Sequence, residues 1–62
     1  MRAQSDMPTE GQFVAMWEHE GEPRAITLRL KDEWLQEYNI KHRTWEVSDL
    51  VLNHNEIYYV VD

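Results

Sequence analysis

The stretch 24–38 constrains the fold of this chain most, because it holds two hydrophobic periods in succession. Across residues 25–31 the apolar Ile26, Leu28 and Leu30 alternate with polar residues. This period of two is typical of a strand with one buried face and one solvated face. We therefore predict a strand here, with these three side chains pointing into a core.

The residues directly after this strand change period. Trp34 and Tyr38 are four apart and follow two acidic residues, which is the spacing of an apolar helix stripe with acids in the first turn, where the helix dipole favours them. Asp32 suits the N-cap and Asn39 a left-handed C-terminal position. We predict a short helix over 33–38.

The rest of the chain suggests further strands joined by tight turns. Phe13, Ala15 and Trp17 share one face of a strand at 12–18, and the segment between Gly21 and Pro23 marks a turn, so this strand should form a hairpin with 25–31. Additional strands are predicted at 44–47, with Trp45 and Val47 inward, at 50–52, and at 57–61, the last two as a second hairpin.

These elements predict an α+β domain with a small antiparallel sheet of four to five strands and one short helix. A small SH3-like barrel is one arrangement of this kind. Residues 1–9 carry little that could be buried and are expected to be a flexible leader, leaving a single domain over 10–62. A chain of 62 residues buries only about 60% of its unfolded surface, so its stability should be marginal.

Composition narrows the classes of function. Twelve acidic against six basic residues give a formal net charge of −6, which opposes direct binding to nucleic acid. The chain has no cysteine, no signal-peptide pattern and no apolar run long enough to span a membrane. We expect a cytoplasmic protein that does not bind membranes.

Metal binding and catalysis find little support. His19, His42 and His54 lie in predicted turns at spacings unlike those of zinc sites. No glycine-rich phosphate loop is present, and no nucleophile has an evident base beside it. We expect no enzyme activity, no metal and no cofactor.

The densest acidic feature is the run containing Glu18, Glu20 and Glu22. In an extended strand, residues two apart lie about 6.6 Å from one another on one side, similar to successive phosphates of a nucleic acid. This pattern gives one hypothesis, in which the protein mimics DNA and occupies a basic groove of a nucleic-acid-binding protein. The alternative is a solvated turn that keeps a small protein soluble.

The aromatic content favours a different surface. Three Trp and three Tyr are many for a core of this size, and such residues are enriched at protein interfaces. We expect partner contacts from the second apolar face of the sheet and from exposed aromatic rings, through Val14, Met16, Trp34, Tyr58 and Val60. The alternative is a well-packed core with tyrosines at its edge and no face covered by a partner. The predicted function is a non-catalytic acidic module that binds another protein, or a second copy of itself, as an inhibitor or accessory subunit.

Overall fold

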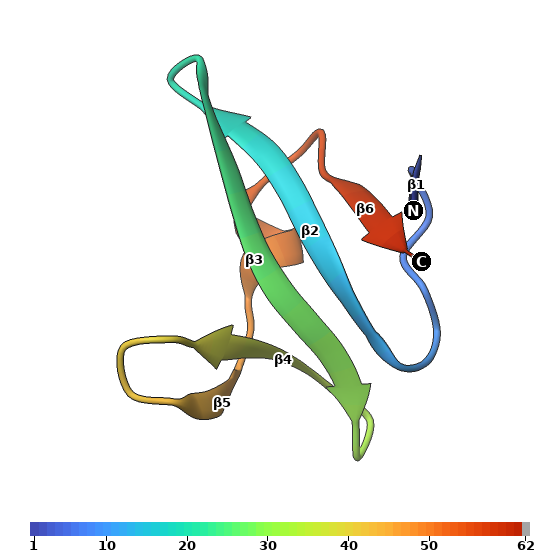
Figure 1. Cartoon of the computed structure of the whole chain (residues 1–62), viewed down its shortest axis with the longest axis vertical. Helices are drawn as coiled ribbons and strands as arrows, with labels where there is room; N and C mark the ends of the chain where they lie inside the picture. The colour runs from blue at the N-terminus through green and yellow to red at the C-terminus, as the bar shows by residue number, and fades with distance from the viewer. Residues whose placement is uncertain (62) are drawn as a thin grey trace.

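The computed structural model describes residues 1–61 and shows a mostly β architecture with one short helix (Figure 1). Its six strands form one antiparallel sheet in the order β1-β6-β2-β3-β4-β5. The elements are β1 (Arg2–Gln4), β2 (Gln12–His19), β3 (Glu22–Lys31), β4 (Trp34–Asn39), β5 (Thr44–Val47), α1 (Leu50–Asn53) and β6 (Tyr58–Val61).

The β2–β3 hairpin is the longest pairing and confirms the predicted first hairpin. Its register runs from Gln12 opposite Arg29 to His19 opposite Glu22. The two residues between the strands, Glu20 and Gly21, both have positive φ, 54° and 81°. This is the backbone of a two-residue turn whose twist matches that of the flanking strands.

The predicted helix at 33–38 is wrong, because this segment is strand β4 and pairs with β3. Asp32 does not cap a helix. Asp32 and Glu33 have φ of 54° and 68° and form a two-residue turn that places Trp34 opposite Lys31. Pairing with β3 satisfies backbone groups along the strand, whereas a helix of six residues is unstable without tertiary support.

The predicted strand at 50–52 is also wrong, because these residues form the single turn α1. The amide of Leu52 donates to the carbonyl of Asp49, and that of His54 donates to the carbonyl of Leu50. The Ser48 hydroxyl accepts a hydrogen bond from the Leu50 amide at 3.2 Å. The predicted second hairpin is therefore absent from the described chain, and β6 pairs instead with β2 and β1.

The sheet has six strands rather than four to five, and it is not closed into a barrel. Its end strands are β1 and β5, and within residues 1–61 these two do not pair with each other. The expected leader 1–9 includes β1, which pairs with β6, and Met7, which packs against the core.

The core lies on one side of the sheet, between the strands and α1. Phe13, Ala15, Leu28, Leu50 and Tyr59 are buried. The rings of Phe13 and Tyr59 meet edge to face, with centroids 5.8 Å apart, an arrangement favoured for aromatic pairs. The burial of Leu28 confirms the inward face predicted for the strand at 25–31. Phe13 and Ala15, predicted to share one face of their strand, are both buried.

Candidate protein-binding face

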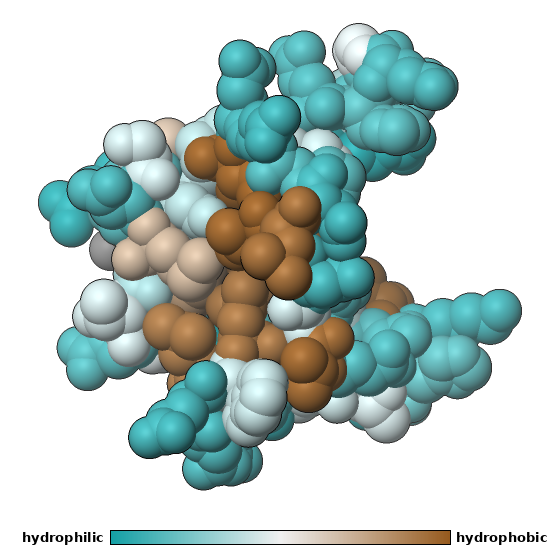
Figure 2. Space-filling view, turned by 180° about the vertical axis from the view of Figure 1, so that it is seen from behind, coloured by the Kyte–Doolittle hydropathy of each residue, from teal (hydrophilic) through white to brown (hydrophobic). Residues whose placement is uncertain are grey.

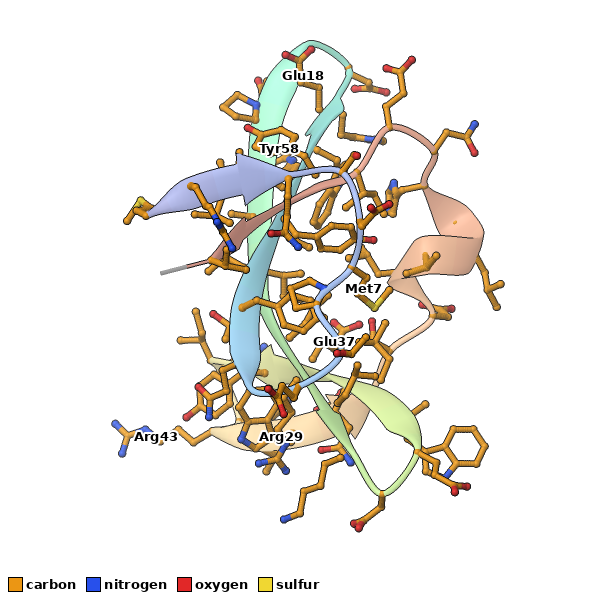
Figure 3. The ribbon with its side chains drawn as sticks, turned by 90° about the vertical axis from the view of Figure 1, so that its right-hand side faces the viewer. Met7, Glu18, Arg29, Glu37, Arg43 and Tyr58 are labelled. Atoms are coloured by element: carbon orange, nitrogen blue, oxygen red, sulfur yellow. The ribbon has the colours of Figure 1, made fainter. Side chains whose placement is uncertain are left out.

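The two faces of the sheet differ in what lies over them. Figure 1 shows α1 behind β2 and β3, and Figure 3 shows it to one side of the sheet, where Leu50 joins the core. We call this side the covered face. Within residues 1–61, no helix or further strand lies over the other side, the open face. By register and alternation, the open face carries Ala3, Gln12, Val14, Met16, Glu18, Pro23, Ala25, Thr27, Arg29, Lys31, Trp34, Gln36, Tyr38, Trp45, Val47, Tyr58 and Val60.

Four of the five residues predicted for partner binding lie together on the open face. Val14 is opposite Val60, and Met16 is opposite Tyr58, in the adjacent strands β2 and β6. Tyr58 is 41% exposed, and the other three are half-buried. The structure therefore places these side chains in one apolar patch.

The fifth predicted residue, Trp34, lies apart from this patch. It is 61% exposed and sits at the β3–β4 turn, opposite Lys31. Along β3, Lys31 is six residues from Ala25, the partner of Met16, a distance of roughly 20 Å in a strand. Trp34 and Met16 therefore belong to different ends of the molecule.

A shallow hollow occupies the middle of the open face. It has a volume of about 290 Å³ and is lined by Val14, Ala25, Ile26, Thr27, Tyr38 and Ile40. Ile40 follows β4 and is 81% exposed. The hollow is large enough to accept an apolar side chain.

An arginine and two aromatic rings form the other end of the open face. The guanidinium carbon of Arg29 lies 4.1 Å from the centroid of Trp45, and its Nε donates to Gln36 Oε1 at 2.8 Å. Tyr38 meets Trp45 edge to face at 5.2 Å. The prediction that Trp45 and Val47 point into the core is therefore wrong: both lie on the open face, and Val47 is exposed.

Sequence reasoning missed Tyr38 and Trp45 as members of this face. Alternation shows that Trp45 and Val47 share a side of their strand, but it does not say which side is covered. Tyr38 was assigned to a helix that does not form. The one usable signal was the surplus of aromatic residues over what a core of this size can hold.

The acidic run does not form a straight row. Glu18 lies in β2, Glu20 in the turn and Glu22 at the start of β3, so the chain reverses between the first and the last. Glu22 also forms an ion pair with Arg24 at 3.4 Å. The hairpin gathers these acids at its tip without the phosphate-like spacing on which the mimicry hypothesis was based.

Carboxylates are scarce on the open face. The described strands contain four acidic residues, Glu18, Glu22, Glu37 and Glu46. By alternation only Glu18, near the hairpin tip, is on the open side, while Arg29 and Lys31 lie there too. The open face is thus apolar and weakly basic, although the whole chain carries a net charge of −6.

Residues 1–61 contain neither a clustered set of metal-ligand side chains nor a membrane-spanning helix. No group of three or more His, Asp or Glu side chains is placed to hold a metal ion. None of the helical structure described there is long and apolar enough to cross a membrane.

Comparison of the chain with known protein families, with curated proteins and with solved structures finds no match. The function must therefore be inferred from the geometry and chemistry of the molecule itself.

Proposed function

We propose that this protein is a non-catalytic protein-binding module that uses its open face to dock onto another protein, as an accessory subunit or an inhibitor. The observation that carries the proposal is the apolar patch formed by Val14, Met16, Tyr58 and Val60, which no other described part of the chain covers. Contiguous exposed apolar surface on a small protein marks an interaction site more often than chance.

Charge favours a different protein over a second copy as the occupant. Two copies would each carry a net charge of −6. Within the described strands, each open face offers Arg29 and Lys31 but only one carboxylate, Glu18. A partner with an apolar patch bordered by carboxylates would complement both the apolar centre and the basic end. Complementary charge of this kind raises the association rate and fixes the orientation of docking.

The size of the face suits a specific contact. The molecule measures 31 × 23 × 21 Å along its principal axes, so the outline of its broadest side is roughly 700 Å², close to the ~800 Å² per partner of a standard interface. A partner would therefore have to cover most of the open face to form a contact of standard size.

The proposal is tested by comparing two apolar-to-acid variants in affinity capture from extracts of the source cells. Met16→Glu places a charge in the apolar patch, whereas Leu52→Glu places the same charge on α1, at a residue 87% exposed. A partner captured by the wild type and by Leu52→Glu, but lost with Met16→Glu, is then purified and titrated against each protein.

The expected result is a loss of at least tenfold in affinity for Met16→Glu and little change for Leu52→Glu. Sedimentation of the isolated protein tests whether a second copy of the chain binds the open face instead. A stable dimer that Met16→Glu dissociates would assign the face to a second copy. Partners that bind both variants equally would contradict a role for the open face.

A further inference from the structure

A second and larger hollow lies at the end of the sheet near the β2–β3 hairpin tip. It has a volume of about 530 Å³ and is lined by Trp17, Glu18, His54, Asn55, Glu56 and Tyr58. Figure 3 shows Glu18 and Tyr58 at this end of the molecule. Apart from Tyr58, none of these residues takes part in the apolar patch.

The hollow exists because β2 continues past the start of β6. Pairing between the two strands covers Val14 to Met16 only, since β6 begins at Tyr58. Beyond Met16, the β6 side of β2 has no strand partner among the described residues. Neighbouring residues of a strand point to opposite faces, so Trp17 and Glu18 border this edge from the two sides of the sheet.

Aromatic rings supply part of the wall. The rings of Trp17 and His54 contact each other in a tilted arrangement, with centroids 4.8 Å apart and an interplanar angle of 35°. Trp17 also packs against the core, and this contact fixes the position of its ring. Tyr58 adds a third ring, from the first residue of β6.

Carboxylates supply the charge. Glu18 and Glu56 both line the hollow and are exposed, and no Lys or Arg is among the lining residues. Arg24, the β3 partner of Trp17, is engaged by Glu22 in an ion pair. The lining thus combines π faces with negative charge, the two features that attract an organic cation.

We propose that this hollow binds the cationic side chain of a lysine or arginine carried by an extended segment of a partner protein. The aromatic rings contact the alkyl stem and the charged head, and Glu18 and Glu56 pair with the charge. Beyond Met16, the edge of β2 that faces β6 has no strand partner within residues 1–61, so its backbone N–H and C=O groups can pair with the backbone of the partner's extended segment. This site goes beyond the proposed function of the open face and requires no apolar partner surface.

The size of the hollow favours a side chain with flanking backbone over a small free cation. A volume of about 530 Å³ falls in the range of roughly 300 to 1,000 Å³ that is usual for ligand sites, well above what one ammonium group fills. A blocked peptide should therefore bind more tightly than its cationic group alone.

The test is a titration followed by the NMR signals of the Trp17 indole and the His54 ring in the full chain. The probes are the blocked tripeptides Ala-Lys-Ala and Ala-Arg-Ala, the neutral control Ala-Norleucine-Ala, and tetramethylammonium as a free cation. Both cationic peptides should shift these signals at millimolar concentration, with an affinity roughly two- to thirty-fold above that of the neutral peptide.

Variants that remove carboxylate charges test whether Glu18 and Glu56 contribute to peptide binding. The double substitution Glu18→Gln and Glu56→Gln should weaken binding of the lysine peptide by at least threefold, while Glu10→Gln, an exposed acid outside the lining, should leave it unchanged. Met16→Glu serves as the cross-check, because it disables the open face without removing a lining residue. Peptide binding that persists in Met16→Glu separates this site from the proposed function.

Three results would overturn the proposal. Equal affinity for the lysine and norleucine peptides would show an apolar site, and no shift up to 10 mM peptide would show no site. Tetramethylammonium binding as tightly as the peptides would assign the hollow to a free organic cation instead of a partner's side chain.

Discussion

The two faces of the sheet carry the same kinds of apolar residue but differ in how deeply these residues are buried. On the covered face Phe13 and Leu28 are buried under α1, while on the open face Val14 and Met16 stay half-buried, with no other described element over them. One helical turn contributes a single buried side chain, Leu50. A short chain can close one side of its sheet, and the apolar residues on the other side therefore require another explanation.

The outer surface of α1 adds to this contrast. Figure 2 views the molecule from behind, the side on which α1 lies, and shows apolar side chains gathered in the middle of that face. Val51 and Leu52 of α1 are exposed, so the solvent-facing side of the helix that covers the core is itself partly apolar. Its outward residues do not contact the core, and they should contribute little to stability.

The largest expected effect comes from placing a carboxylate on each face at neighbouring positions. Leu28→Asp should unfold the protein, because a buried unpaired charge costs about 3 to 5 kcal/mol, comparable to the roughly 3 to 9 kcal/mol that stabilises a domain of this size. Thr27→Asp, one residue away on the open face, should remain folded. Circular dichroism and urea denaturation check both variants. Equal stability of the two would mean that the assignment of faces is wrong.

Two leucines of α1 provide a second, smaller contrast. Leu50 is 6% exposed and Leu52 is 87% exposed. Leu50→Ala should lower the free energy of unfolding by about 2 to 5 kcal/mol, through lost burial and the cavity left behind. Leu52→Ala should change it by no more than about 0.5 kcal/mol. A large effect of Leu52→Ala would indicate that α1 packs against something not seen in the isolated chain.

The inward face of β3 could be predicted because apolar and polar residues alternate clearly along it. Along β2 the sequence shows only which residues share a face, because both of its faces are apolar. The assignment of β4 could not be predicted, because Trp34 and Tyr38 are four residues apart and share a face in a helix and in a strand alike. The deciding feature is the turn at Asp32 and Glu33, where two residues other than glycine adopt positive φ. No local sequence rule strongly predicts that conformation for Glu.

The binding sites were harder still to predict. Four residues of the apolar patch were found because β2 is apolar on both sides and Tyr58 and Val60 alternate with Tyr59. The hollow at the sheet end was missed, because it depends on where β6 starts and on the contact of His54 with Trp17, two residues far apart in the sequence. The sequence places His54 only in a predicted turn.

A third prediction separates apolar docking from nucleic-acid mimicry, once a partner is in hand. Met16→Ala should weaken the complex by about 1 to 2 kcal/mol, through faster dissociation, because truncation removes desolvated contact area. Met16 is preferred to Tyr58 for this purpose, since Tyr58 also lines the second hollow.

The matched change is the triple substitution of Glu18, Glu20 and Glu22 by Gln. Under apolar docking it should alter mainly the association rate, which responds to charge around the contact. Under mimicry the triple substitution should weaken the complex by well over tenfold and flatten the salt dependence of its affinity. Added DNA should then also compete with the wild-type protein for the partner. Surface plasmon resonance between about 50 and 200 mM salt distinguishes the two hypotheses.

The smallest expected effect concerns the basic end of the open face. Arg29 lies over Trp45 and is held there by its hydrogen bond to Gln36, so it both shields the indole and keeps a positive charge beside the apolar residues. Arg29→Ala should lower stability by only about 0.5 to 1 kcal/mol, because the cation–π pair remains partly exposed to solvent. It should also increase the acrylamide quenching of Trp45, measured in a protein in which Trp17 and Trp34 are replaced by Phe.

Arg29→Lys is the informative control, because a lysine keeps the charge but lacks the planar group that stacks on a ring and the Nε–H that reaches Gln36. If Arg29 acts through stacking, the lysine variant should resemble the alanine variant in quenching while retaining the partner's salt dependence. Quenching that is unchanged in both variants would show that Trp45 is not shielded by Arg29, and the basic end would then be open to a partner as an exposed aromatic surface.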